Sequence, residues 1–256
     1  METTALIKKW KICEENAQIT GWDFSCIDGK YFEDTSFPWD YKESVKKHLF
    51  PDAMLLDIDT GGGEFFKSLG HPYDKCSATE NYQPNVKLCE KRLLPLGINF
   101  KQGSAKKLPF DANSFDVVIN RHGDFCPKEI RRVLKSGGIF ITQQVGAEND
   151  REFINLLYQK ELPLAFTEQY LEKAKEKFVS ENFEIIESYE CKKPIIFYDT
   201  EALIWFAKII EWEFQDFSVD NCLDGLLKAH SIIKDQGFVK AHTHRFFLVA
   251  KLIFSN

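Results

Sequence analysis

The sequence predicts an α/β fold with a doubly wound sheet, and three observations favour it. Short apolar runs alternate with helical stretches over about 100 residues from Ala53 onward, as in parallel sheets covered by helices. The first run ends in an acidic residue and three glycines, Gly61 to Gly63. The length of 256 residues, with 44% hydrophobic and 28% charged residues, suits one large α/β domain or one domain with modest additions.

Residues 1–50 are predicted to form helix, loop and helix ahead of the sheet. Apolar residues recur at helical spacing at the start, and Gly29 and Pro38 interrupt the pattern that follows. Asp40 is a candidate N-cap for a short helix that ends near Leu49. We assign this segment to an N-terminal helical cover, either an aromatic lid over a ligand or plain packing on the sheet. The residues considered for a lid are Trp22, Asp23, Phe24, Phe37, Trp39 and Tyr41.

The strands and helices of residues 51–256 follow from short apolar runs and from helical spacing. The seven predicted strands are Ala53–Ile58, Lys75–Thr79, Ile98–Lys101, Phe115–Ile119, Ile139–Thr142, Phe183–Glu190 and Arg245–Phe254. The main predicted helices are Val86–Leu94, Pro127–Leu134, Glu168–Val179 and Glu201–Ile210. We assign residues 51–256 to one domain, with an aromatic-rich insertion around residues 197–235. Within it, Tyr198–Phe217 is a candidate for the far wall of an apolar pocket, with Trp205, Phe206, Trp212, Phe214 and Phe217.

Composition excludes several classes of protein. The formal net charge of −6, from 33 Lys and Arg against 39 Asp and Glu, disfavours a protein that follows a nucleic-acid backbone. Seven scattered cysteines without a Cys-x-x-Cys pair indicate free thiols in a reducing compartment. The sequence has no run of about 18 apolar residues, which predicts no membrane span, and its first residues do not resemble a signal peptide. We therefore expect a cytoplasmic protein.

The glycine cluster after the first predicted strand favours an adenosine-containing cofactor. Glycines let the backbone turn sharply and leave no side chain between it and a ligand. Glu80 stands at the end of the second predicted strand, where a carboxylate can accept hydrogen bonds from both hydroxyls of a ribose. In open α/β sheets, ligands lie beyond the carboxyl ends of the strands. This combination favours a ligand site over a plain strand-to-helix turn.

The glycine spacing argues against a dinucleotide. The dinucleotide fingerprint, Gly-x-Gly-x-x-Gly, needs a third glycine where this sequence has Phe66. Asp57, at the end of the first strand, suits a positively charged ligand instead. An NAD-dependent oxidoreductase is therefore the weakest interpretation. No metal site is predicted, because His242 and His244 have too few further ligands nearby, and both are assigned to the surface.

Four motifs, in order over residues 53–146, resemble class I S-adenosylmethionine-dependent methyltransferases. The resemblance is strongest to the small bacterial enzymes related to the ubiquinone and menaquinone biosynthesis type. The residues that carry it are Leu55–Gly63, Ala78–Glu80, Leu108–Phe110 with Ser114–Val118, and Glu129–Gly138. It implies S-adenosylmethionine as cofactor and a Rossmann-like, seven-stranded sheet whose last strand is antiparallel.

Two positions depart from the pattern of this family. Asp59 replaces the first glycine of its first motif, so this carboxylate either attracts the cationic cofactor or obstructs it. Ser104 stands where an Asp often accepts the adenine amino group, and a hydroxyl accepts that bond more weakly than a carboxylate.

The resemblance places the cofactor on the glycine loop and on the loops after the next strands. The residues predicted to bind it are Asp57, Asp59, Thr60, Gly61, Gly63, Glu80, Asn81, Ser104, Ala105 and Asn120. The methyl acceptor is expected past the fourth and fifth strands. His122 is the candidate general base, because an ordinary histidine has a pKa of about 6.5; a structural histidine is the alternative. Arg121 would hold either an anionic substrate or a neighbouring carboxylate.

The sequence therefore predicts an enzyme that transfers a methyl group from S-adenosylmethionine to a small or medium-sized acceptor. An RNA or protein methyltransferase is the second interpretation, and it predicts a basic face around Arg121, Arg131 and Arg132. A non-catalytic protein that keeps the fold and binds a partner is the third, because of Asp59. The expected partner is a small-molecule methyl acceptor, with no membrane and with nucleic acid disfavoured.

Overall fold

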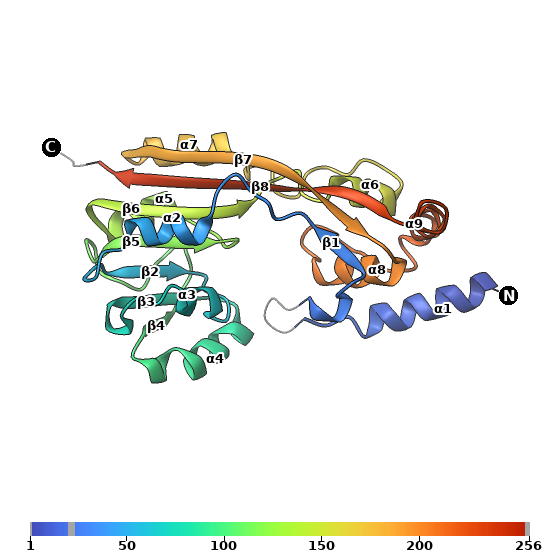
Figure 1. The fold of residues 1–256 in the computed structure, drawn as a ribbon, viewed down its shortest axis with the longest axis horizontal. Helices are drawn as coiled ribbons and strands as arrows, with labels where there is room; N and C mark the ends of the chain where they lie inside the picture. The colour runs from blue at the N-terminus through green and yellow to red at the C-terminus, as the bar shows by residue number, and fades with distance from the viewer. Residues whose placement is uncertain (1, 20–23, 254–256) are drawn as a thin grey trace. The chain divides into compact units, whose positions relative to one another are not determined.

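The structure is a computed structural model that describes residues 2–19 and 24–253. Over these residues, one sheet of eight strands has the order β1-β7-β8-β6-β5-β2-β3-β4 (Figure 1). The strands are β1 Tyr31–Glu33, β2 Leu55–Ile58, β3 Cys76–Glu80, β4 Asn99–Gln102, β5 Phe115–Arg121, β6 Leu134–Val145, β7 Phe183–Phe197 and β8 Val239–Leu252. Strands β4, β3, β2, β5 and β6 are parallel, and β8 runs antiparallel to β6. The predicted fold class is confirmed.

The helices connect these strands and have recognisable start signals. They are α1 Glu2–Glu15, α2 Tyr41–His48, α3 Glu64–Ser68, α4 Gln83–Arg92, α5 Pro127–Val133, α6 Arg151–Tyr158, α7 Leu171–Ser180, α8 Thr200–Ile209 and α9 Leu223–Gln236, with short 3-10 turns at Ser25–Ile27, Tyr73–Lys75 and Leu94–Leu96. Asp40 caps α2 as predicted, since its side chain accepts the backbone N–H of Glu43. Helix α5 begins with Pro127, at a position where proline loses no helical hydrogen bond.

The chain divides into two compact units. Unit 1 comprises residues 1–36, 147–167 and 192–244, and unit 2 comprises residues 37–146, 168–191 and 245–256. The N-terminal cover predicted over residues 1–50 is therefore shared between the two units. Trp22 and Asp23, considered for a lid, lie outside the described residues, and the lid remains a prediction.

Both faces of the sheet are buried in unit 2. Leu56 and Val118 belong to one hydrophobic cluster, whereas Leu55 and Val117, one position earlier, belong to another. Helices α5 and α7 contribute to the first cluster, and α2, α3 and α4 contribute to the second. Burial on both faces explains why these strands are continuous apolar runs in the sequence rather than alternating ones.

The aromatic residues predicted to form a pocket wall fill the core of unit 1. Trp205, Phe206, Phe214 and Phe217 are buried there in one cluster, together with Trp10 from α1. The cluster draws on α1, α6, α8 and α9. These four side chains therefore contribute to packing, whereas Trp212 is 42% exposed. The pocket wall remains a prediction.

The described sheet has one strand more than predicted. Strand β1 pairs antiparallel with the last residues of β7, where Tyr31 lies opposite Phe197 and Glu33 opposite Ile195. Those residues lie beyond the predicted end of β7 at Glu190. The sequence is polar just past that point, so the apolar pattern stops although the backbone continues in the sheet.

Strand β8 also begins earlier than predicted, and this corrects the assignment of one histidine. His244 lies within β8 and is buried. Its Nδ1 accepts the backbone N–H of Glu148 at 3.1 Å, and its own backbone N–H donates to the side chain of Asn149 at 2.9 Å. His242 is half-buried, and its Nδ1 lies 2.6 Å from Oε1 of Glu152. The surface role predicted for His244 is therefore wrong.

Candidate functional site

The direction of connection reverses at the middle of the sheet, between β2 and β5. From β2 the chain continues outward through β3 and β4, and β5 then returns to the other side of β2. At such a switch point the loops after neighbouring strands separate, and ligands of open α/β sheets lie beyond them. The glycine loop follows β2 and the predicted acceptor residues follow β5, so both groups lie at this point.

The loop after β2 is fixed by hydrogen bonds to its own strand and to β3. The hydroxyl of Thr60 donates to Asp57 Oδ2 at 2.6 Å, and the N–H of Thr60 donates to the carbonyl oxygen of Thr79 at 3.0 Å. Asp59 adopts a left-handed conformation with φ 55°. Asp is one of the few residues besides glycine that tolerate this conformation.

Two of the loop glycines have different tasks. Gly61 and Gly63 both have positive φ, 64° and 76°. A Cβ at Gly63 would lie 2.7 Å from the side chain of Leu93, so this glycine permits close packing. A Cβ at Gly61 would meet nothing within 4 Å. The backbone at Gly61 therefore faces open space in which a ligand can approach.

Glu80 ties the end of β3 to the glycine loop. Its Oε1 accepts the backbone N–H groups of Asn81 at 2.8 Å and Tyr82 at 2.9 Å. Its Oε2 accepts the N–H of Gly61 at 2.9 Å and the side-chain amide of Asn85 at 3.4 Å. Glu80 is buried, while Asn81 and Tyr82 are exposed. The carboxylate is thus held in one orientation at the edge of the loop.

Two carboxyl groups of the loop, those of Asp57 and Asp59, have pKa values raised to near neutral pH. Burial raises the pKa of Asp57 to about 7, against the opposing effects of the Thr60 hydroxyl and of Arg121. Burial and the nearby charges of Glu80 and Asp124 raise the pKa of Asp59 to about 7. Within the described residues, neither carboxyl group forms an ion pair. A cation bound beside them would favour the ionised form of both carboxyl groups.

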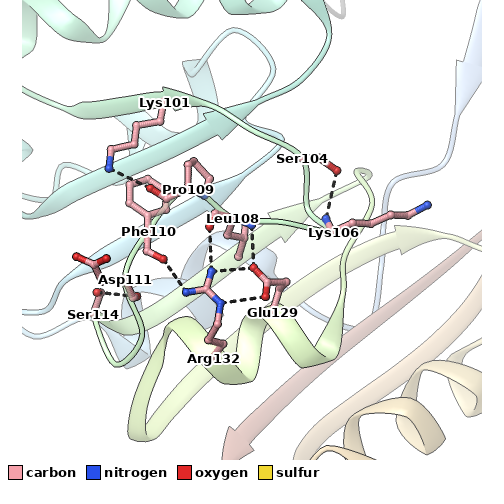
Figure 2. A network of polar contacts seen from close by, with 10 residues as sticks. All are labelled: Lys101, Ser104, Lys106, Leu108, Pro109, Phe110, Asp111, Ser114, Glu129 and Arg132. Carbon is pink, nitrogen blue, oxygen red and sulfur yellow. Dashed lines mark hydrogen bonds and ion pairs between the residues drawn. The ribbon is translucent and has the colours of Figure 1, made fainter.

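The loop after β4 carries Ser104 and Ala105 and is anchored on α5. The guanidinium of Arg132 donates to the carbonyl oxygens of Phe110 at 2.7 Å and Leu108 at 2.9 Å, and to both oxygens of Glu129 (Figure 2). Glu129 also accepts the backbone N–H of Leu108 at 2.9 Å. One bidentate pair therefore fixes three backbone groups of this loop.

Ser104 and Ala105 begin this loop beside β3. The N–H of Gly103 donates to the carbonyl oxygen of Glu80 at 3.1 Å, which brings the two loops together. The hydroxyl of Ser104 accepts the N–H of Lys106 at 3.2 Å (Figure 2), and Ala105 is buried. The hydroxyl predicted to face an adenine thus already has one partner in its own loop.

Asn120 is fully buried and holds three strand ends together. Its side-chain amide donates to the carbonyl oxygens of Ile58 at 2.9 Å and Asp124 at 3.3 Å. Its Oδ1 accepts from Gln144 at 2.5 Å and from Thr142 at 3.4 Å. In these contacts the NH₂ group and the oxygen of the Asn120 side chain both have partners within the protein, so the amide fixes the positions of the surrounding strand ends. The predicted direct contact between Asn120 and the cofactor remains a prediction.

Arg121 and His122 follow at the end of β5. The guanidinium of Arg121 lies over the ring of Phe65, 4.5 Å from its centroid. His122 has φ 63°, and Gln143 at the end of β6 brings its amide nitrogen to 3.2 Å from His122 Nε2. Both residues remain exposed, on the side where the acceptor was expected.

The surroundings of His122 oppose a positive charge on its ring. Desolvation, followed by the charges of Arg245 and Arg121, lowers the pKa of His122 to about 3. Solvent reaches the exposed part of the residue and screens these charges. The ring is therefore neutral at pH 7, and its lowered pKa makes His122 a weaker base than the sequence suggested.

The methyltransferase-domain family matches residues 56–142 of this chain. This range covers the glycine loop, Glu80, the loop after β4 and the residues after β5. Residues 56–142 are thus similar to a methyltransferase domain.

The chain is also similar to curated methyltransferases, and this similarity is confined to part of the chain. The phthiotriol/phenolphthiotriol dimycocerosates methyltransferase of Mycobacterium tuberculosis is 38% identical over 31% of this chain and 32% of that protein. The corresponding enzyme of Mycobacterium leprae is 39% identical over 38% of this chain and 40% of that protein. The matched region thus spans about a third of the first of these relatives and less than half of the second.

A solved structure extends the likeness of the fold over most of the chain. The YcgJ protein of Bacillus subtilis superposes with a TM-score of 0.57 and covers 84% of this chain and 99% of its own. The identity is 15%, so this match supports the fold alone.

The residues of this site fit S-adenosylmethionine, the cofactor that the methyltransferase-domain family implies. The open face of Gly61 leaves room for a ligand, and the carboxyl groups of Asp57 and Asp59 suit its sulfonium and ammonium charges. Among the described residues, no group of three or more His, Cys, Asp or Glu could hold a metal. No helix of that part of the chain is long and apolar enough to cross a membrane.

Three features of the site were missed in the sequence. Gly123 leaves room for Asp59, since a Cβ there would lie 2.6 Å from the Cβ of Asp59. The Glu129–Arg132 pair was visible only as part of a motif. Trp39, from the segment before α2, donates to Gln143 at 2.8 Å across 104 positions of the sequence. Local spacing carries no signal for contacts of that range.

Proposed function

We propose that this protein is an S-adenosylmethionine-dependent methyltransferase acting on a small or medium-sized acceptor. One observation carries the proposal: the ends of β2 and β3 place Asp57, Asp59 and Glu80 around a glycine whose face is open. A ligand that offers both hydroxyl groups and a positive charge matches this combination. S-adenosylmethionine has both, and when bound it supplies a methyl group activated by the sulfonium charge.

Glu80 would bind the ribose, and its present contacts support that role. Its oxygens are oriented by three backbone N–H groups at 2.8–2.9 Å, those of Gly61, Asn81 and Tyr82. The fourth contact, from Asn85, is long at 3.4 Å and is the one that ribose hydroxyls would replace at least cost. Asn81 would flank the ribose, and Ser104 and Ala105 would border the adenine.

Asp57, Asp59 and Thr60 would bind the charged end of the cofactor. Both carboxyl groups have a pKa of about 7 without a ligand, so a nearby positive charge would shift them toward the ionised form. Thr60 holds Asp57 in place through its hydroxyl. Asp59 thus acts as a contact in this proposal and not as an obstacle.

The acceptor side combines Arg121 and His122 with an aromatic surface. The ring of Trp39 stacks on Phe37 at 5.1 Å, on Phe247 at 5.7 Å and on Tyr189 at 6.3 Å, and Tyr189 is 42% exposed. The mycobacterial relatives are named for phthiotriol and phenolphthiotriol dimycocerosates, which supports a lipid-like acceptor here as well. An apolar acceptor would favour such a surface.

The RNA or protein alternative loses support in this arrangement. It needs a basic face that includes Arg131 and Arg132. Arg132 is occupied by Glu129 and two carbonyl oxygens, and Arg131 lies 3.5 Å from Glu181. These guanidinium groups are therefore neutralised by their own chain. The scattered cysteines of the sequence, without a Cys-x-x-Cys pair, support the cytoplasm as the place of action.

Isothermal titration with S-adenosylmethionine and S-adenosylhomocysteine tests the cofactor. We expect micromolar binding of both, lost in Glu80→Ala and kept in Glu90→Ala, a matched change at an exposed position of α4. Absence of heat with both ligands at high concentration would exclude the enzyme and leave the non-catalytic alternative. Transfer of a labelled methyl group to apolar compounds then tests the acceptor class.

A further inference from the structure

The orientation of the Gln143 side chain is determined by Trp39. The indole N–H of Trp39 can only donate a hydrogen bond, and it lies 2.8 Å from Oε1, the carbonyl oxygen of the Gln143 side chain. An amide rotated by half a turn would place its own NH₂ group against this donor. The NH₂ group of Gln143 must therefore face the other way, toward His122.

This orientation determines which nitrogen of His122 carries the proton. The amide nitrogen of Gln143 lies 3.2 Å from His122 Nε2, and an NH₂ group can only donate. Nε2 therefore accepts, and in the neutral ring the proton is on Nδ1. A protonated ring would turn Nε2–H against the NH₂ group and lose this hydrogen bond.

The charged groups around the ring act in the same direction. Arg121 from β5 and Arg245 from β8 both lower the pKa of His122. On the β2 side the loop presents Asp59, which contacts the position of Gly123 next to His122 and has its own pKa raised to about 7. The hydrogen-bond geometry and the charges thus both favour a neutral ring.

We propose that His122 binds the methyl acceptor as a neutral hydrogen-bond donor, through Nδ1–H, and that Trp39 and Gln143 position it by fixing this tautomer. The inference rests on the proposed methyltransferase function. It assigns to the acceptor an oxygen beside the nucleophile that can accept a hydrogen bond. No proton passes to His122, so the base role predicted from the sequence is replaced by a binding role.

The tautomer can be measured directly by long-range ¹H–¹⁵N correlation of the histidine rings in the ligand-free protein. His71 provides an internal reference, because its Nε2 lies 2.7 Å from the carbonyl oxygen of Ala53 and must carry the proton. We expect His122 to show Nδ1–H and no imidazolium between pH 5 and 8, opposite to the tautomer of His71. An Nε2–H signal, or an imidazolium at pH 6, would overturn the proposal.

Two variants test the chain of hydrogen bonds from Trp39 through Gln143 to His122 without changing His122. In Gln143→Glu one carboxylate oxygen still accepts from Trp39 and the other faces His122, so we expect His122 to switch to Nε2–H and to titrate at a higher pH. In Trp39→Phe the amide is free to rotate, and we expect both tautomers. An unchanged tautomer in Gln143→Glu, in a variant that keeps its near-ultraviolet spectrum, would contradict the role of Gln143.

Activity tests the donor role. Asn tolerates positive φ and keeps a neutral donor, so His122→Asn should lose less than about 10-fold in kcat/KM. His122→Ala should lose about 100-fold, because an acceptor that is misplaced by about 1 Å reacts slowly. Equal activity of His122→Ala and the wild type would reject the contact with the acceptor. If the cofactor does not bind at all, the proposed function fails. The tautomer measurement still decides whether Trp39 and Gln143 fix the tautomer of His122.

Discussion

The side chain of Asp59 lies directly against Gly123: a Cβ at Gly123 would lie 2.6 Å from the Cβ of Asp59 and 2.9 Å from its Oδ2. The chain thus has an aspartate where the family has its first glycine, and a glycine opposite it that leaves room for the side chain. This pairing supports Asp59 as an accommodated part of the loop.

A double-mutant cycle tests this pairing. We expect Gly123→Ala to destabilise the protein by about 1–3 kcal/mol through overpacking and to weaken cofactor binding. In the Asp59→Gly background the same change should cost much less, with a residual effect from Asn120, whose amide would lie 3.0 Å from the new Cβ. Chemical denaturation measures the coupling, and strictly additive effects would contradict the contact.

The raised pKa of Asp57 predicts how stability depends on pH. Its folded pKa is about 7, whereas an unfolded aspartate has a pKa of about 3.9. As pH rises from 4, the unfolded state loses its proton first, so the free energy of unfolding falls until about pH 7 and then levels off. His122 contributes the opposite slope below pH 6.5, because its folded pKa is lowered. The test is therefore the free energy of unfolding of the wild type minus that of Asp57→Asn, which should fall between pH 5 and about pH 7 and then level off.

Binding of a cationic cofactor should release protons near neutral pH. Asp57 and Asp59 are partly protonated at pH 7 without ligand, and a sulfonium and an ammonium beside them favour the ionised forms. We expect the affinity for S-adenosylmethionine to rise from pH 6 to 8, and the binding heat to vary with the ionisation enthalpy of the buffer. Asp59→Asn should reduce the number of protons released. Heats that are identical in all buffers would contradict the prediction.

The conformation of the loop after β4 should depend on the planar guanidinium group of Arg132. Lys at this position keeps the charge but cannot donate to Leu108, Phe110 and Glu129 at once. We expect Arg132→Lys to lower the free energy of unfolding by about 1–3 kcal/mol and to weaken binding of adenosine-containing ligands. Arg131→Lys, next to it on α5, is the matched control, since its contact with Glu181 is long at 3.5 Å. Equal effects of the two changes would contradict this assignment.

Local patterns predicted most of the sheet and the turn after β2, whereas the cofactor contacts remain predictions. Strands β2 and β5 are buried on both faces, so their apolar runs were visible, and the glycines needed their positive φ where the sequence placed them. Glu80 was predicted to end a strand and does end β3, and its contact with a ribose remains a prediction. These features depend on neighbours within a few residues.

The rest depends on contacts between distant segments. Strand β1 has only three residues and no alternating pattern, so only its partner in β7 identifies it. The role of His122 depends on Gln143 and Trp39, and the chemistry of an isolated histidine suggested a base. Sequence patterns give residue types at strand ends, whereas charge and hydrogen-bond direction at those ends come from the packed structure.

The last strand has a consequence for anyone who shortens this protein. The matched family region ends at residue 142, yet β6 pairs along Ile139–Val145 with Arg245–Lys251 of β8. A fragment that stops after β6 would keep every recognisable motif and expose an unpaired, apolar strand edge, which is a template for aggregation. The smallest piece that can be recognised as a methyltransferase is therefore smaller than the smallest piece that can be expected to stay in solution.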